Sequence, residues 1–390
     1  PLAPVESLSL SLSLSLLLLL LMWWPCLSDP YCAPVVLLGA LSFALVVVVG
    51  AGVLLLLLWW RPLPPPTHSL LPAWSRTVMA HRGCMQVEGL PENSLPAFAH
   101  ALCCGVDGVE CDVHLARDGE VVVFHDYDLQ RMCGRSARVC DLSQEEMQGA
   151  EFLGMSGVDA VQQFPHVVPV LQAVFPHCEP SSLWRIPTLE ELMLLVKHHN
   201  TKLFIEIKEF VRVAEITRRV ADLLAKHHLH PNSVVISFFP QVLWHTRAVD
   251  PTIHTCQLVR RCFLKPLSEN PTAGPQCHWL VRAFPSLADK LLYHCALSGW
   301  LHTRLGVSAV GPENSLSTPS LVAFFAKKDL LLSTWVVDEP QKKQELLAAG
   351  GSITSNFLFR EDARALRLPP PPQEPLPHSQ PPVNSAGIPT

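Results

Sequence analysis

The sequence predicts an α/β fold, an irregular (β/α)8 barrel that follows one or two membrane-spanning helices. Between residues 75 and 367, short runs rich in β-branched and aromatic residues alternate with stretches that carry apolar residues at helical spacing. Two long apolar runs, 7–24 and 35–60, precede this region. Proline-rich segments bound it: a linker at 61–74, and a tail at 368–390 that we expect to be disordered.

Eight β-rich runs indicate a closed barrel. They lie at 77–80, 108–113, 120–124, 203–207, 233–237, 255–258, 307–310 and 331–337. Helices are predicted at 95–104, 189–199 and 211–228, where apolar residues recur every three or four positions. Strands that alternate with helices are typical of parallel sheets, because a crossover must return the chain to the same edge.

Three segments depart from an ideal barrel. The connection at 115–119 is too short for a crossover helix, and its Asp118-Gly119 pair is a turn signal, so the barrel must be irregular there. The long stretch 127–185 predicts an inserted subdomain over the barrel mouth. Charged residues interrupt the apolar stretch 279–305, which favours an amphipathic helix on a membrane or on the barrel over a third span.

The apolar runs predict an integral membrane protein of the endomembranes or the plasma membrane. The run 35–60 has no charged residue and is long enough to cross a bilayer. The run 7–24 is interpreted as a second span or as the core of a signal peptide. Arg61 and Arg76 follow the second run and favour a cytosolic domain, although the side of the membrane stays open.

Composition argues against nucleic-acid binding and against a metal site built from cysteines. The net charge is −5 and no cluster of basic and aromatic residues is present, so nucleic acid is not an expected partner. The 13 cysteines form no metal-binding spacing, and most are expected to be free thiols or small buried residues. Disulfides in a lumenal domain remain an alternative that the spacing cannot assign.

Three acidic residues on apolar strands predict a metal site. Glu110 and Asp112 are two positions apart in a predicted strand, so their side chains share one face. Glu206 occurs in the next parallel run, two residues before Lys208. Buried carboxylates repel each other unless a cation joins them. Oxygen ligands without Cys or His suit Mg²⁺ or Ca²⁺.

Two histidines directly follow predicted strands. His81 comes after the run 77–80, and His125 comes after the run 120–124. Catalytic residues of a barrel gather at the carboxyl ends of its strands, so both imidazoles are candidates for acid and base catalysis. The other sixteen histidines, such as His198, are expected to be solvated.

Taken in order, these motifs resemble those of the glycerophosphodiester phosphodiesterase family across nearly the whole predicted domain. They are MAHRG at 79–83, PENS at 91–94, VECDV at 109–113, DG at 118–119, VFHD at 123–126, IPTL at 186–189, IEIK at 205–208 and STW at 333–335. The resemblance implies a distorted TIM barrel of the phospholipase C-like phosphodiesterase type. It also implies hydrolysis of glycerophosphodiesters to an alcohol and sn-glycerol 3-phosphate with one divalent cation.

Roles carry over to the residues that match these motifs. The resemblance implies that His81 and His125 are the acid and the base, and that Glu110, Asp112 and Glu206 are the metal ligands. The resemblance also implies a set of residues that bind the phosphate and the rest of the substrate. These are the cations Arg82 and Lys208, the site-shaping acid Glu92 and the aromatic wall Trp335.

Two departures and two alternatives accompany the resemblance. Cys84 and Met85 stand where the family commonly has a further small residue, and Asn356 stands where an acid commonly ends the last strand. The same residues could serve a lysophospholipase D that acts on lysophospholipids or N-acyl lysophospholipids. A catalytically silent membrane adaptor would keep the barrel, but the complete set of site residues argues against it. Protein partners are unknown.

Overall fold

The structure is a computed structural model that describes residues 38, 47, 50, 62–83, 87–154 and 156–357. The chain divides into two compact units, Pro1–Arg61 and Pro62–Thr390. The predicted spans 7–24 and 35–60 lie outside the described residues, apart from Leu38, Val47 and Gly50, and so do the tail 368–390 and the Cys84-Met85 pair. Among the residues described, no helix combines the length and the apolar character needed to cross a bilayer.

The second unit is a closed barrel of eight parallel strands. Strand β1 pairs with both β2 and β9, which closes the sheet in the order β1, β2, β4, β5, β6, β7, β8, β9. The strands are β1 (Val78–Ala80), β2 (Gly108–Leu115), β3 (Val121–Val123), β4 (Lys202–Ile207), β5 (Ser233–Ser237), β6 (His254–Val259), β7 (Ala309–Pro312), β8 (Leu331–Thr334) and β9 (Ser352–Ser355).

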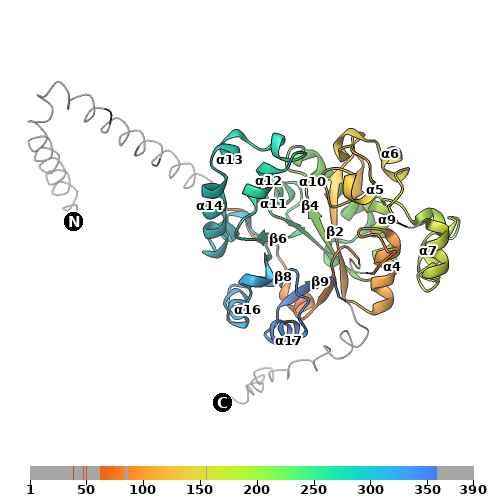
Figure 1. Ribbon diagram of the computed structural model, residues 1–390. Coiled ribbons are helices and arrows are strands. Elements are labelled where there is room, and N and C mark those ends of the chain that lie inside the picture. The colour runs from red at the N-terminus through yellow and green to blue at the C-terminus, as the bar shows by residue number, and fades with distance from the viewer. Residues whose placement is uncertain are drawn as a thin grey trace, which may run out of the picture. The chain divides into compact units, whose positions relative to one another are not determined.

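Helices surround this barrel (Figure 1). They are α3 (Leu71–Trp74), α4 (Leu95–Cys104), α5 (Gln130–Cys133), α6 (Gln144–Gln148), α7 (Gly157–Gln163), α8 (Val168–Val174), α9 (Leu189–His198), α10 (Val213–His227), α11 (Pro240–Val249), α12 (Leu264–Glu269), α13 (Trp279–Ala283), α14 (Pro285–Leu297), α15 (Trp300–Leu305), α16 (Pro319–Ala326) and α17 (Pro340–Ala348). The three predicted helices correspond to α4, α9 and α10. Their apolar faces are buried against the strands, as their spacing predicted.

One predicted barrel strand is wrong. The run 120–124 forms β3, which pairs antiparallel with β2 in a hairpin and is not part of the closed barrel. The eighth barrel position belongs to β9, which joins β8 to β1. A short connection can join only antiparallel neighbours, so the turn after β2 excludes β3 from the parallel ring. The irregularity expected at this turn is therefore the hairpin.

The two long segments between strands consist of several short helices each. The stretch 127–185 contains α5, α6, α7 and α8 with short 3₁₀ turns between them. The stretch 279–305 forms three helices, α13, α14 and α15, instead of one continuous amphipathic helix. Proline at the start of α14 and glycine before α15 explain the breaks, because neither residue continues a helix well. The ten cysteines in the described part of the chain are free thiols.

The barrel interior is apolar near its amino-terminal end. Trp74 of α3 is buried and stacks on Phe204 of β4, with their ring centroids 5.1 Å apart. Leu70 belongs to the same core cluster. The segment before α3 also lies on the barrel, because the amide of Leu63 donates to the carbonyl of Arg304 at 3.1 Å.

Candidate active site

The three predicted carboxylates come together at the carboxyl ends of β2 and β4. Glu110 and Asp112 project from one face of β2, and Asp112 is the register partner of Glu206 on β4. All three residues are buried, and each has a ligand atom within 4.8 Å of those of the other two. The alternation of strand side chains and the pairing of two strands are thus enough to build the cluster.

This cluster fits a hard divalent cation. Within the described residues, Glu110 Oε1 is buried and has no hydrogen-bond partner. Burial, together with the charges of Asp112 and Glu206, raises the pKa of the Glu110 carboxyl well above its usual value. A cation would remove both costs, and an all-oxygen set of donors is the kind that Mg²⁺ and Ca²⁺ prefer.

Two cationic side chains flank the carboxylates. Lys208 Nζ lies 3.0 Å from Asp112 Oδ1 and 2.5 Å from Glu206 Oε1. Arg82 Nε lies 3.2 Å from Asp112 Oδ2. Burial alone would raise the pKa of Asp112, but Lys208 and Arg82 hold it well below its usual value. Asp112 is therefore ionised, and the site places its negative charge beside two fixed positive charges.

The turn after β1 and the turn before α4 hold Asp112 and Arg82 in place. Asn93 Nδ2 donates to Asp112 Oδ2 at 2.8 Å, and the Asp112 amide donates to Asn93 Oδ1 at 3.2 Å. Arg82 Nη1 donates to Glu92 Oε1 at 3.0 Å. Gly83 has φ +86°, and a Cβ there would lie 2.8 Å from the backbone of Ala97, so the turn requires glycine.

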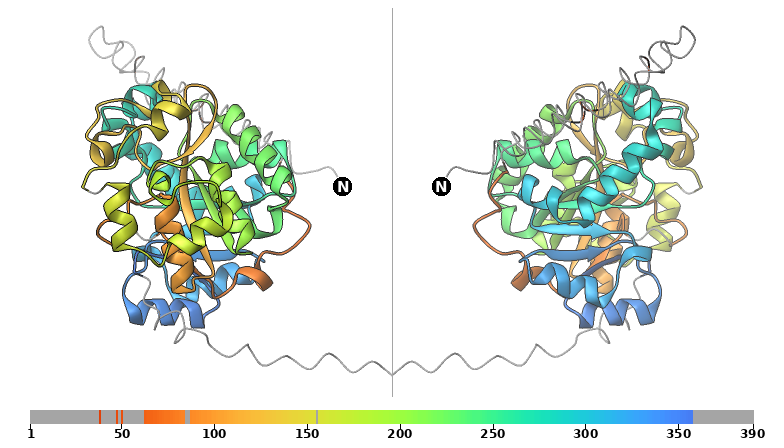
Figure 2. Two further views of the ribbon diagram at one scale, coloured as in Figure 1. Left: turned by 90° about the vertical axis from the view of Figure 1, so that its right-hand side faces the viewer. Right: turned by 90° about the vertical axis from the view of Figure 1, so that its left-hand side faces the viewer.

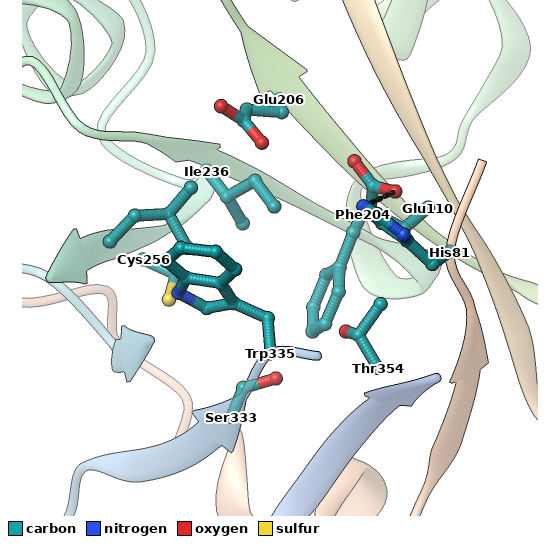
Figure 3. Close-up of a pocket in the computed structure, with 10 residues that line it drawn as sticks. His81, Glu110, Phe204, Glu206, Ile236, Cys256, Ser333, Trp335 and Thr354 are labelled. Atoms are coloured by element: carbon teal, nitrogen blue, oxygen red, sulfur yellow. Dashed lines mark ion pairs between the residues drawn. The ribbon is translucent and has the colours of Figure 1, made fainter. Parts of the chain in front are cut away.

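His81 is held in one orientation by the end of the last strand. Its Nδ1 lies 2.6 Å from Asn356 Oδ1. Asn356 donates from its amide and from Nδ2 to the two carboxylate oxygens of Asp338, each at 2.9 Å, so its Oδ1 is the atom left to face the imidazole. Burial and the neighbouring Arg82 lower the pKa of His81 to about 4. The imidazole is neutral near pH 7, with Nε2 4.0 Å from Glu110 (Figure 3).

His125 is supported by a separate network. Its Nδ1 lies 2.6 Å from Asp126 Oδ1, and Asp126 Oδ2 accepts from Arg131 Nε at 2.7 Å. Although burial raises the pKa of the Asp126 carboxyl, the bonds from His125 and Arg131 lower it well below its usual value. Arg131 of α5 also donates to Glu92, which links this network to Arg82.

A cavity of about 590 Å³ opens over these groups, and one of its walls is apolar. His81, His125 and Lys208 line its base. The aromatic side chains of Phe238 and Phe263 stack with centroids 4.3 Å apart and form one wall. Trp335 meets Phe238 edge to face at 5.3 Å, and Figure 3 shows its indole across the pocket from the acidic side chains. An anion could therefore bind at the base with a nonpolar group against the wall.

The structure brings all nine predicted site residues to one end of the barrel. Glu110, Asp112 and Glu206 form the cluster, five of the other six line the cavity, and the sixth, Glu92, pairs with Arg82. Sequence reasoning assigned no function to Arg131, Asp338 or Asn356. In the sequence, Asn356 stands out only as a departure at the last strand. Arg131 and Asp338 lie in loops or short helices without a motif, so no local signal singled them out.

A family comparison decides the relationship. Residues 81–353 match the model of the glycerophosphoryl diester phosphodiesterase family. The chain belongs to this family. A curated relative is glycerophosphodiester phosphodiesterase 1 from Bos taurus, 26% identical over 285 residues that cover 72% of this chain and 78% of the relative. The Homo sapiens protein of the same name is 26% identical over 268 residues, covering 68% and 73%.

Solved structures of the family share the fold. A phosphodiesterase from Oleispira antarctica, in complex with the product sn-glycerol-3-phosphate, superposes with a TM-score of 0.52 at 18% identity and covers 74% of this chain and 96% of its own. A glycerophosphodiester phosphodiesterase from Parabacteroides distasonis gives a TM-score of 0.51 at 20% identity, with coverage of 74% and 96%. The TIM barrel of the glycerophosphodiester phosphodiesterases is thus the fold of this chain.

Proposed function

We propose that this chain hydrolyses glycerophosphodiesters to an alcohol and sn-glycerol 3-phosphate and uses Mg²⁺ or Ca²⁺. One observation carries the proposal: two imidazoles line a cavity that also contains Glu206 of the buried carboxylate triad. Membership of the family supports the reaction class, and the names of the curated relatives support the substrate class. The complete site also argues against a silent adaptor.

The chemistry requires fixed positive charge. Negative charge grows on the phosphoryl oxygens of a phosphodiester as a nucleophile attacks, so the site must stabilise those oxygens. Arg82 and Lys208 supply two buried cations beside the carboxylates. The cation held by Glu110, Asp112 and Glu206 would supply Lewis-acid stabilisation when bound. The carboxylates in turn keep both side chains charged, because they raise the pKa of Arg82 and Lys208 against the effect of burial.

The two imidazoles differ in their surroundings, which suggests a division of work. His81 is neutral near pH 7, because its pKa is lowered to about 4, so its Nε2 can accept a proton from the attacking hydroxyl. That hydroxyl is either water or a glycerol hydroxyl of the substrate, the latter giving a cyclic phosphate first. His125 is held in one orientation by the Asp126 carboxylate, 2.6 Å from its Nδ1, and we assign to its Nε2 the proton donation to the leaving alcohol.

Lysophospholipids are a second candidate substrate class. Phe238, Phe239 and Phe263 pack against one another and form an apolar wall of the cavity. Aromatic surface of this kind would be covered by the start of an acyl chain. The same catalytic residues would then act as a lysophospholipase D, with the chain against the wall.

We also infer that the protein is integral to an endomembrane or the plasma membrane. The support is the length and apolar character of the run 35–60, with the run 7–24 as a second span or a signal peptide. A membrane location would place the enzyme beside lipid-derived substrates.

Hydrolysis of glycerophosphocholine by the full chain tests the proposed function. We expect release of sn-glycerol 3-phosphate and choline, loss of turnover with EDTA, and recovery with Mg²⁺ or Ca²⁺. His125→Ala should lower kcat by about 100-fold or more, because it removes a proton-transfer group. The matched control is His198→Ala, on the exposed surface of α9, which should keep wild-type turnover. Full activity after exhaustive EDTA treatment, or near-normal turnover of His125→Ala, contradicts the proposal.

A further inference from the structure

Large apolar side chains are exposed on α13 and α14. Trp279, Leu280, Phe284, Leu287 and Leu291 are each between 47% and 67% exposed. The last two are four residues apart in α14 and therefore lie on one helical face. We call these five side chains the α13–α14 surface. The helices form the outer edge of the barrel in Figure 1, and the right-hand view of Figure 2 turns them toward the viewer.

The segment that carries this surface is also rich in exposed basic residues. Residues 260–304 contain six Lys and Arg against two acidic residues, although the whole chain has a net charge of −5. One of the two acids, Asp289, is buried. Arg261, Lys265, Arg282 and Lys290 are exposed. A surface that carries both apolar side chains and cations is complementary to an anionic lipid bilayer. The apolar side chains enter its acyl layer, and the cations bind its headgroups.

The α13–α14 surface is connected directly to the mouth of the active site. Helix α12 lies between them and supplies Pro266 and Leu267 to the cavity. Asp289 of α14 accepts hydrogen bonds from the amides of Phe263 at 2.8 Å, Leu264 at 2.7 Å and Lys265 at 3.0 Å, which fixes α14 to the start of α12. Phe263 forms part of the apolar wall of the cavity. Helix α14 is therefore fixed directly beside the segment that supplies the apolar wall of the cavity.

The chain also enters the barrel next to this segment. Leu63 bonds to Arg304 of α15, and Gly306 approaches Leu63 so closely that a Cβ there would lie 2.6 Å from its carbonyl oxygen. The apolar run 35–60 ends only a few residues earlier in the sequence. The first described residues of the barrel unit therefore lie beside α15, which directly follows α14.

We propose that the α13–α14 surface docks on an anionic lipid bilayer and admits lipid-borne substrates to the active site. The substrate class is a phosphodiester that carries one acyl chain, taken from the bilayer along α12 to the wall at Phe263. The proposal rests on the proposed phosphodiesterase function for its chemistry. It adds a surface, a partner and a route that a water-soluble glycerophosphodiester would not need.

Insertion of Trp279 into lipid is the direct test. The full chain is reconstituted in phosphatidylcholine vesicles with or without phosphatidylserine, and tryptophan fluorescence is quenched with brominated acyl chains. The difference between wild type and Trp279→Phe isolates the signal of Trp279 from the other tryptophans. We expect quenching of Trp279 that increases with phosphatidylserine. An unquenched Trp279 overturns the proposal, and cross-linked dimers with Trp279 shielded from lipid would assign the surface to a second copy of the chain instead.

Kinetics with two substrates test the route. The double variant Leu287→Asp with Leu291→Asp should lower kcat/KM for bilayer-embedded lysophosphatidylcholine at least about tenfold, because charged side chains oppose insertion. Turnover of soluble glycerophosphocholine should stay at the wild-type level, which also verifies folding. The control is Val158→Asp on α7, an exposed apolar residue on the other side of the barrel in Figure 1.

The outcomes separate the two proposals. Equal losses for both substrates, or no loss for the embedded one, overturn the docking proposal. It is also overturned if the wild type hydrolyses glycerophosphocholine but not embedded lysophosphatidylcholine, a result that leaves the proposed function standing. Failure of the wild type to hydrolyse either substrate contradicts the proposed function itself.

Discussion

At the scale of single residues, Glu110 is the group whose environment most requires a cation. Its pKa is raised in the folded state by burial and by Asp112 and Glu206. A carboxyl with a raised folded pKa stabilises the fold below its unfolded pKa, and this contribution is lost as the pH rises toward the folded pKa. Without metal, the wild-type protein should therefore lose stability as the pH rises above the ordinary glutamate value of 4.5.

Glu110→Gln should stabilise the metal-free protein near pH 7, because glutamine cannot ionise in the unfolded state or in the buried cluster. This gain should appear as a higher Tm of the metal-free variant than of the metal-free wild type. Added Mg²⁺ or Ca²⁺ should raise the Tm of the wild type, since a ligand that binds only the native state stabilises it, and should not raise that of the variant. Differential scanning calorimetry with EDTA and with metal measures both effects.

Glu120→Gln is the control for this prediction. Burial raises the pKa of Glu120 as well, but this residue lies outside the carboxylate cluster. Its variant should keep the full metal-induced rise in Tm. An equal response to metal in wild type and Glu110→Gln would remove Glu110 from the ligand set.

Residue types and spacing predicted the cluster but not its supports. Glu110 and Asp112 could be placed on one face because strand geometry has a fixed period of two. Arg131 could not be predicted, since it reaches Glu92 and Asp126 from a short helix whose position depends on tertiary packing. Isolated arginines are common on surfaces, and nothing local marks this one.

At the scale of secondary structure, the predicted set of barrel strands is wrong where the hydrophobic pattern of a segment does not determine which strand it pairs with. The run at β3 is strongly apolar and indicates a strand, but only the length of the preceding turn decides that it pairs antiparallel. Strand β9 is Ser352–Ser355, with one large apolar residue, Ile353. Its burial comes from closure of the barrel between β8 and β1, which periodicity does not report.

The ends of β8 and β9 together orient the first imidazole, and a swap of two residues tests this positioning role. Asn356→Ala should lower kcat about tenfold with little change in KM, because the His81 tautomer is no longer fixed while substrate contacts remain. The double variant Asn356→Asp with Asp338→Asn restores an acceptor for His81 Nδ1 and a donor for the residue beside it. This double variant should recover most of the activity. Asn356→Asp alone should not, because it places two carboxylates side by side.

Steady-state kinetics on the three variants separate positioning from simple structural damage. A merely structural role for Asn356 would lower the Tm and the activity of the double variant as much as those of the alanine variant. Recovery of kcat in the double variant would not occur in that case. Unchanged kcat in Asn356→Ala would show that the hydrogen bond to His81 does not matter for turnover.

At the scale of the whole molecule, closure of the barrel is what joins distant motifs into one site. His81 and Asn356 are 275 residues apart and are brought within hydrogen-bond distance only because β1 pairs with β9. The sequence predicted a barrel from the alternation of strands and helices, so it also predicted that residues after the strands would meet. It could not predict the wall at Phe263, which depends on how α12 and α14 pack outside the ring.

Membrane anchorage is the prediction that concerns the chain as a whole. At about 1.5 Å per residue, a helix over 35–60 would be roughly 39 Å long, more than the ~30 Å hydrocarbon core of a bilayer. We expect the full chain to stay in the membrane pellet after alkaline carbonate extraction. Two pairs of substitutions test the two runs: Leu45→Arg with Val48→Arg, and Leu18→Arg with Leu20→Arg. Each arginine at a helix centre opposes insertion by about 2.5–3.5 kcal/mol. A chain with both pairs should therefore move to the supernatant, and each pair alone identifies which run anchors the protein. Recovery of the wild-type chain in the supernatant would contradict anchorage by either run.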